Sequence, residues 1–74
     1  MNSEHLIRMA NQIGVFFESM PDRTEAMESF ATHLKKFWDP RMRRAFLQVL
    51  DEGDNPRVSE MVRAAVREHR ALLT

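Results

Sequence analysis

The 74-residue sequence contains no cysteine and no tyrosine, and it has only two glycines, three prolines and one tryptophan. Without cysteine, no disulfide can form and no iron–sulfur cluster can be held by thiolates. Two isolated glycines exclude a glycine-rich phosphate loop. A catalytic site needs a nucleophile, a base and a group that stabilises developing charge, and no such set occurs at a fixed spacing. We therefore predict that the chain is not an enzyme.

The charge shows no excess of either sign, because 11 basic and 11 acidic residues give a formal net charge of zero. This balance argues against a general binder of nucleic acids or anionic membranes, although a local basic patch remains possible. No window approaches the roughly 20 apolar residues that span a bilayer, and polar residues interrupt the N-terminal segment too early for a signal peptide. We expect a cytoplasmic protein.

Apolar residues recur with the period of an α-helix along the whole chain, and no segment alternates as a strand does. A chain of this length buries only about 60–65% of the surface that its unfolded form exposes, so it forms one small domain at most. We predict an all-α fold, a single four-helix domain over residues 1–74 with short proline-containing joints. The predicted helices span about 3–20, 22–38, 40–52 and 56–73.

Each predicted helix has one apolar stripe. The first stripe consists of Leu6, Met9, Ala10, Ile13, Phe16, Phe17 and Met20, and Ile7 and Val15 lie off it. The second consists of Ala26, Met27, Phe30, Ala31, Leu34, Phe37 and Trp38. The third consists of Met42, Ala45, Phe46, Val49 and Leu50, with Leu47 at its margin. The fourth consists of Val58, Met61, Val62, Ala65, Val66, Leu72 and Leu73.

Capping residues mark the predicted helix ends. Asp22 is a good N-cap for the second helix, and Asp39 followed by Pro40 is typical of a helix start. The joint at Asp39-Pro40 is too short for an easy antiparallel hairpin, so we expect the second and third helices to meet at a steep angle. Gly53 is a predicted C-terminal cap, and Asp54-Asn55-Pro56 repeats the pattern of a cap followed by proline.

The three histidines, His5, His33 and His69, lie on three different predicted helices. A zinc site favours paired ligands, such as two histidines four residues apart, and none are paired here. His69 falls within the apolar stripe of the fourth helix. We interpret it first as a neutral core histidine with one hydrogen-bond partner, with a partner interface and a metal ligand as weaker alternatives.

Gly14 stands in the middle of a predicted helix, where glycine costs about 1 kcal/mol relative to alanine. One interpretation is close packing between two helices of this chain. The other is that the backbone of a partner approaches there. In the second case Ile7 and Gly14 would belong to a docking surface, so both are candidate partner-binding residues.

Residues 35–44 concentrate five cations around the single tryptophan. A nucleic-acid site resembling a helix-turn-helix, a protein-binding hot spot and a core tryptophan beside a solvated basic face are all possible interpretations. Arg43 lies at the edge of the apolar stripe, where a cation needs a carboxylate from Asp39 or from a partner. We name Trp38, Asp39, Arg41 and Arg43 as candidate partner-binding residues.

Three sequence motifs resemble a known family. They are Arg8-Met9-Ala10-Asn11-Gln12-Ile13-Gly14 with Phe16-Phe17, then Met20-Pro21-Asp22-Arg23, and then His33-Leu34 followed by Phe37-Trp38-Asp39-Pro40-Arg41-Met42-Arg43. In this order they resemble the delta subunit of the soluble, NAD-dependent, molybdenum-containing formate dehydrogenases of bacteria. The resemblance covers roughly residues 5–50, and beyond Gly53 it is only general.

The resemblance implies a non-catalytic accessory subunit that binds the catalytic alpha subunit of formate dehydrogenase. It implies a role in assembly, stability or insertion of the molybdenum cofactor. The molybdenum cofactor, iron–sulfur clusters, FMN and NAD would belong to the partner subunits, and this chain would hold no cofactor. The alternative function is a small helical regulator that binds nucleic acid through residues 35–44. Self-association is also possible, since a second copy can cover an exposed apolar flank.

Overall fold

The computed structural model describes residues 2–53 and 55–74, and these residues form five helices without a strand. The helices are α1 (Ser3–Glu18), α2 (Arg23–Phe37), α3 (Pro40–Asp51), α4 (Glu60–Glu68) and α5 (Arg70–Leu73). The predicted all-α class is therefore confirmed. The first three helices lie close to their predicted positions, and the fourth differs.

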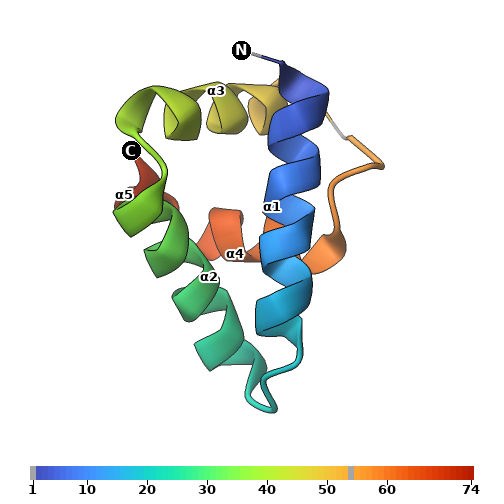
Figure 1. Cartoon of the computed structure of the whole chain (residues 1–74), viewed down its shortest axis with the longest axis vertical. Helices are drawn as coiled ribbons and strands as arrows, with labels where there is room; N and C mark the ends of the chain where they lie inside the picture. The colour runs from blue at the N-terminus through green and yellow to red at the C-terminus, as the bar shows by residue number, and fades with distance from the viewer. Residues whose placement is uncertain (1, 54) are drawn as a thin grey trace.

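In Figure 1, α1 and α2 form a V, α3 crosses its open end and α4 lies behind. The chain measures 32 × 24 × 18 Å along its principal axes. α2 contacts α1, α4 and α5, and α1 contacts α2, α3 and α4, so these two helices form the centre of the fold. The steep angle predicted between α2 and α3 is confirmed, as Figure 1 shows.

Aspartate side chains cap α2 and α3 as predicted. The Asp22 carboxylate accepts a hydrogen bond from the Glu25 N–H at 3.2 Å, and the Asp39 carboxylate accepts one from the Met42 N–H at 3.0 Å. Pro40 is the first helical residue of α3, where its missing N–H has no intrahelical partner to lose. At the other end of α3, Gly53 has a φ of +141°, which glycine adopts more readily than other residues.

The prediction of one helix over residues 56–73 is wrong. α4 begins at Glu60, where the Ser59 hydroxyl accepts a hydrogen bond from the Val62 N–H at 3.3 Å. The helix ends at Glu68, and His69 (φ −119°, ψ 27°) separates it from α5. His69 is only partly buried, so it marks a break in the helix rather than a site in the core. Asp54, the first residue of the predicted cap, lies outside the described residues.

Asn11 of α1 explains why the chain before Ser59 is not helical. Its side-chain N–H₂ donates to the Arg57 carbonyl at 2.7 Å, and its side-chain oxygen accepts from the Ser59 N–H at 3.0 Å. These two bonds occupy backbone groups that a helix starting at Pro56 would use itself. Val58 is buried as predicted, but from this loop rather than from a helix.

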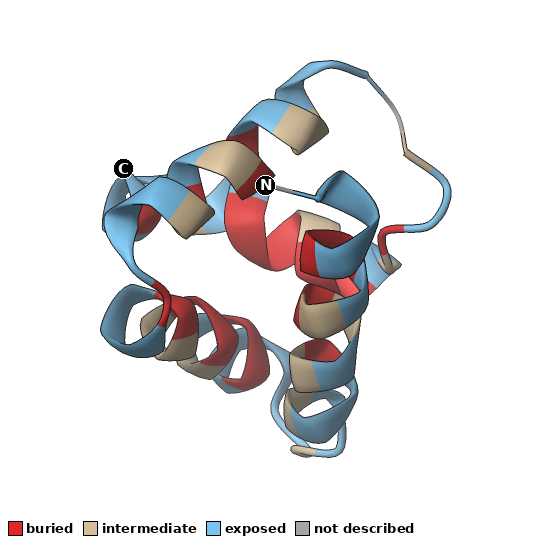
Figure 2. Ribbon diagram, turned by 45° about the horizontal axis from the view of Figure 1, so that its top comes forward, coloured by how far each residue is buried: buried red, intermediate tan, exposed pale blue. Residues whose placement is uncertain are grey.

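The core lies where the buried sides of the helices converge, as the red segments in Figure 2 show. Its largest fully buried side chains are those of Phe30, Phe46, Leu6, Leu34, Leu73, Val58 and Val62. The buried side of α1 is rotated from the predicted stripe: Leu6 and Ala10 are buried as predicted, but Ile7 and Gly14 are buried too and Phe16 is exposed. On α3, Leu47 is buried rather than marginal.

Three residues that were predicted to face the core are exposed instead: Phe16, Phe37 and Leu72. Phe16 is exposed because the Gly14 side of α1 packs on α4 and rotates the helix away from the predicted stripe. Phe37 and Leu72 lie in the final turns of α2 and α5, where the helix ends and no further described element covers them. The apolar periodicity of a short helix therefore defines its buried face only approximately.

Candidate partner-binding surface

The six predicted partner-binding residues divide into a buried and an exposed group. Ile7, Gly14, Trp38 and Arg43 are buried. Asp39 and Arg41 are exposed. In this conformation only the exposed pair offers side chains to a partner, while the other four act inside the chain. Their part in partner binding stays a prediction.

Trp38 is a core residue that closes α2. Its side chain is 5% exposed, and its ring lies edge-on to the ring of Phe46 with 5.7 Å between the centroids. The backbone N–H of Trp38 donates to the Leu34 carbonyl at 3.0 Å, while the Trp38 backbone is already extended (φ −89°, ψ 135°). Trp38 thus ends the helix and anchors the following joint to α3.

Arg43 braces the same joint. It is 9% exposed, and its Nη1 donates to the Lys35 carbonyl in the last turn of α2 at 2.7 Å. Carbonyls there lack intrahelical partners, and a cation is favourable at the negative end of the helix dipole. The expected ion pair with Asp39 is not found among the described residues, because the Asp39 carboxylate caps α3 instead. The Arg43 Nε has no hydrogen-bond partner in the described part of the chain.

Gly14 lies against α4. A Cβ added there would come within 2.8 Å of Val62 Cγ2 and 3.4 Å of Met61 Cε. Both neighbours are buried, so a side chain at this position would displace core atoms. The interpretation of Gly14 as a site of close packing inside the chain is confirmed.

Exposed charged residues alternate in sequence with the buried Trp38 and Arg43, and we call this charged surface the α2–α3 corner. It consists of Asp39, Arg41 and Arg44. Arg41 and Arg44 are three residues apart on α3, which places them side by side on its surface. The corner therefore presents two neighbouring cations on a rigid support.

A second exposed feature is a row of rings, which we call the aromatic strip: Phe16, Phe17, His33 and Phe37. The ring centroids of successive members lie 5.1, 5.7 and 4.7 Å apart, and the row crosses from α1 to the end of α2. Phe16 and Phe37 are each 71% exposed. The strip was not predicted from the sequence, because both phenylalanines fit the apolar stripes. The sequence did contain one indication of the strip, the adjacent pair Phe37-Trp38 at a helix end. Two neighbouring side chains there cannot both point into one core.

Two open hollows adjoin the strip. One, of about 290 Å³, is lined by Ile13, Phe16, Phe17 and His33. The other, of about 380 Å³, is lined by Phe17, Glu28, Ser29, Thr32, His33, Lys36 and Phe37. The second hollow therefore joins apolar rings to an acidic and a basic side chain of the same helix.

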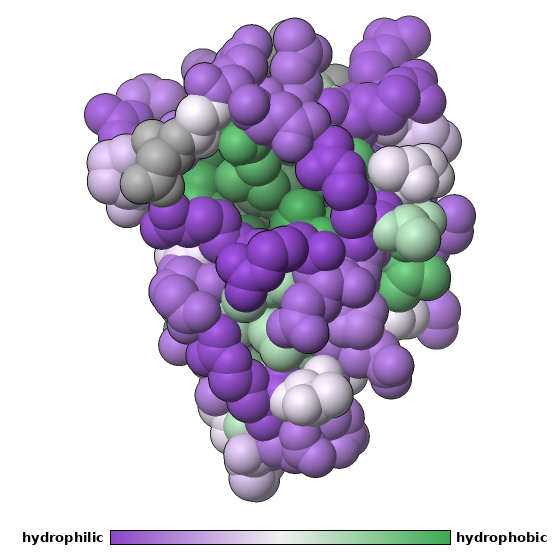
Figure 3. All heavy atoms as spheres, turned by 180° about the vertical axis from the view of Figure 1, so that it is seen from behind, coloured by the Kyte–Doolittle hydropathy of each residue, from purple (hydrophilic) through white to green (hydrophobic). Residues whose placement is uncertain are grey.

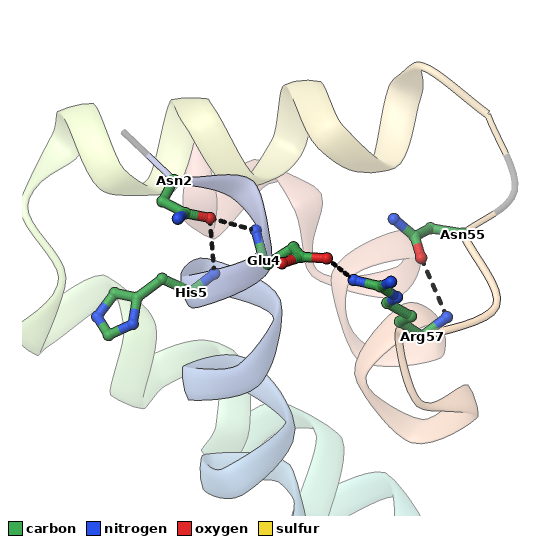
Figure 4. Close-up of polar contacts among 5 residues, drawn as sticks. All are labelled: Asn2, Glu4, His5, Asn55 and Arg57. Atoms are coloured by element: carbon green, nitrogen blue, oxygen red, sulfur yellow. Dashed lines mark hydrogen bonds and ion pairs between the residues drawn. The ribbon is translucent and has the colours of Figure 1, made fainter.

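Exposed ion pairs tie the helix ends together on other faces. Arg57 pairs with Glu4 beside the cap of α1, where the Asn2 side chain accepts from the Glu4 and His5 N–H groups (Figure 4). The face turned away from the viewer of Figure 1 is largely hydrophilic, with hydrophobic side chains visible in a recess of its upper half (Figure 3).

Two further pairs shift the pKa of a carboxyl group. Arg70 forms two hydrogen bonds to Asp51 at 2.9 and 2.6 Å, and these bonds lower the pKa of Asp51 below 3.8. Arg23 donates to Glu60 at 2.6 Å, and this bond lowers the pKa of Glu60 below 4.5. Both carboxyl groups are exposed, and the pairs link α3 to α5 and α2 to α4.

Neither surface has the composition of a metal centre. Among the described residues, no group of three or more histidine, cysteine, aspartate or glutamate side chains could hold a metal ion. None of the described helices combines the length and the apolar character needed to cross a membrane.

Comparison with known proteins identifies the family. No curated protein and no solved structure matches the chain. Residues 5–66, however, match the family described as the NADH-dependent formate dehydrogenase delta subunit FdsD. The match includes all three motifs noted in the sequence and extends beyond Gly53 into α4. The chain therefore belongs to the family of formate dehydrogenase delta subunits.

Proposed function

We propose that this chain is a non-catalytic accessory subunit that binds the catalytic alpha subunit of a cytoplasmic NAD-dependent formate dehydrogenase. In this role it supports assembly, stability or molybdenum-cofactor insertion. The molybdenum cofactor, iron–sulfur clusters, FMN and NAD then belong to the partner subunits. The observation that carries the proposal is the family match over residues 5–66.

The geometry supports the α2–α3 corner as the docking surface for that subunit. The buried Trp38 and Arg43 fix the joint between α2 and α3, so the backbone that carries Arg41 and Arg44 is already ordered before a partner binds. Arginines are over-represented in protein-binding hot spots and bind carboxylates with two hydrogen bonds. The corner therefore suits an acidic surface on the catalytic subunit.

Charge reversal at the corner tests this proposal. A tagged chain carrying Arg41→Glu and Arg44→Glu is co-expressed with the formate dehydrogenase subunits, and the catalytic subunit recovered with the tag is measured. We expect the unchanged chain to recover the catalytic subunit. The double variant should recover at least about tenfold less of it, because two cations that face carboxylates become two anions. Both positions are exposed, so the fold should be kept.

Arg8→Glu is the matched control, because Arg8 is an exposed arginine on another side of the molecule, on α1 beside Glu4 and Arg57. It should leave recovery unchanged.

Failure of the unchanged chain to recover any formate dehydrogenase subunit would refute the proposed function. If the double variant recovered as much catalytic subunit as the unchanged chain, the corner would be excluded as the docking surface, but the proposed function would stand. If the chain instead shifted DNA or RNA at low salt, with affinity falling steeply as salt rises, the nucleic-acid alternative would replace this proposal.

A further inference from the structure

The aromatic strip is a contiguous apolar feature that the fold leaves uncovered. Its outer rings, those of Phe16 and Phe37, are exposed, and Phe17 and His33 join them into one row. Contiguous exposed apolar area on a small protein marks a site of interaction more often than scattered single residues do. The strip is therefore a candidate binding surface.

The charges next to the strip indicate the occupant. Glu28, Thr32 and Lys36 follow one another at intervals of four residues on α2, so they share one face of the helix, and all three line the hollow beside Phe17 and Phe37. Glu28 and Lys36 carry opposite charges at equal distances in sequence from Thr32. When two copies of this stripe lie antiparallel, Glu28 of one copy faces Lys36 of the other, so the stripe is complementary to itself.

The residues around the middle of the stripe are small. Ser29 and Thr32 lie between the two charges, and both line the same hollow. Small side chains at the centre of a helix face let a second helix approach closely, while the longer charged side chains reach across at the two ends. A parallel approach would set like charges against each other, so the stripe favours an antiparallel one.

We propose that the aromatic strip and the neighbouring face of α2 bind a second copy of this chain, with the two α2 helices antiparallel about a two-fold axis at Thr32. In such a contact each residue meets its counterpart reciprocally, so Glu28 of each copy faces Lys36 of the other. The same contact removes the exposed rings of both copies from water, which supplies the main driving force. The inference goes beyond the proposed function, since it concerns a second copy of this chain and rests on residues other than Arg41 and Arg44.

A cysteine at the axis tests the geometry directly, because the natural chain contains none. Thr32→Cys places two thiols at the axis, within reach of a disulfide, which needs Cα atoms about 4.4–6.8 Å apart. Under mild oxidation the full-length variant should become a covalent dimer that migrates at twice the mass. Val15→Cys is the control: Val15 is 69% exposed on α1 but does not line either hollow of the strip, and it should crosslink far more slowly.

Sedimentation of the isolated chain over a concentration range up to about 1 mM measures the association itself. The unchanged chain should show a monomer–dimer equilibrium. Phe16→Ser and Phe37→Ser should each shift it strongly to monomer, and Val15→Ser should leave it unchanged. All three positions are exposed, so circular dichroism should report the same helical content for each variant.

Charge reversal identifies the antiparallel pairing. Glu28→Lys and Lys36→Glu should each weaken dimerisation roughly tenfold, since every attractive pair becomes repulsive. An equimolar mixture of the two variants should recover the original affinity as a heterodimer. In that heterodimer the lysine introduced at position 28 of one copy faces the glutamate introduced at position 36 of the other, and the natural Lys36 and Glu28 still face each other. The double variant, with both charges exchanged, should also recover the original affinity.

A monomer at every concentration, or equal crosslinking rates for Thr32→Cys and Val15→Cys, would overturn the inference. So would a mixture of reversed variants that fails to recover the dimer. These outcomes differ from a failure of the proposed function, which is judged by recovery of formate dehydrogenase subunits with variants of Arg41 and Arg44. A chain that dimerises but recovers no catalytic subunit would retain this inference and refute that function.

Discussion

Phe37 and Trp38 are neighbours in the sequence, yet they belong to two different aromatic groups. Trp38 packs edge-on against Phe46 and is 5% exposed, whereas Phe37 lies beside His33 at the end of the aromatic strip and is 71% exposed. Both are large, apolar and at the end of α2. The difference comes from the backbone, which is helical up to Phe37 and extended at Trp38, so that the tryptophan turns into the core and the phenylalanine remains outside.

This comparison distinguishes two roles of aromatic residues in the same motif, one in stabilising the fold and one in binding. The pair Trp38–Phe46 stabilises the joint between α2 and α3 from within, together with the Arg43 bond to the Lys35 carbonyl. The outer rings of the strip, those of Phe16 and Phe37, are exposed and contribute little to the fold, so they are available for binding. A substitution in the first group should therefore reduce stability, and one in the second should reduce association.

The largest effect is expected from Trp38→Ala, which should lower the free energy of unfolding by about 3–5 kcal/mol through loss of buried area and a cavity. Phe37→Ala should change it by no more than about 0.5 kcal/mol, since its ring is already exposed to water. Urea denaturation of both variants measures the contrast. Equal destabilisation by the two substitutions would break the distinction between the buried pair and the strip.

A medium effect is expected at Gly14, which extends the comparison to α1. Gly14→Ala places a methyl group within 2.8 Å of Val62 Cγ2, and Val62 is short, β-branched and fully buried, so it cannot move aside easily. Overpacking costs about 1–3 kcal/mol, while alanine gains about 1 kcal/mol in helix propensity. We expect a net loss of about 1 kcal/mol in thermal or urea unfolding.

Val62→Ala provides the matched test of this contact. In the Val62→Ala background the added methyl group at position 14 has room, so Gly14→Ala should become neutral or stabilising. If Gly14→Ala destabilises both backgrounds equally, the close approach of α1 to α4 is not its cause.

The smallest effect is expected at the exposed ion pairs. Because the pKa of Asp51 and that of Glu60 are lower in the folded chain, their contribution to stability is present above the unfolded values of 3.8 and 4.5 and is lost as the pH falls through the folded values. Asp51→Asn and Glu60→Gln should therefore flatten the loss of stability on acidification below about pH 4.5. Thermal unfolding at several pH values measures this slope.

Arg70→Met should have the same effect on the slope as Asp51→Asn, and the two together should add nothing further, because they remove one interaction. At neutral pH each variant should differ little from the unchanged chain, since exposed pairs contribute little. A steeper acid transition in Asp51→Asn would show that the sign assigned to this pair is wrong.

The residues whose roles were predicted correctly share a local cause. Asp22 and Asp39 mark helix starts through hydrogen bonds to N–H groups three residues on, and Pro40 fits the first helical position because it lacks an N–H. The residues that were predicted wrongly depend on distant partners. The start of α4 depends on Asn11, far away in the sequence, and the exposure of Phe16 depends on Gly14 meeting Val62.

Residue type and short-range spacing are enough to establish the all-α class, the caps of α2 and α3, the absence of thiol chemistry and, through the motifs, the family. The side of each helix that faces the core depends on tertiary packing, and so does the finding that Trp38 and Arg43 are structural while Phe16 and Phe37 are exposed. The helical period of the apolar residues defines the buried side of a helix only to within about one residue. The close packing of α1 on α4 and the extended backbone at the end of α2 resolve it, because a dense core admits only one arrangement of side chains.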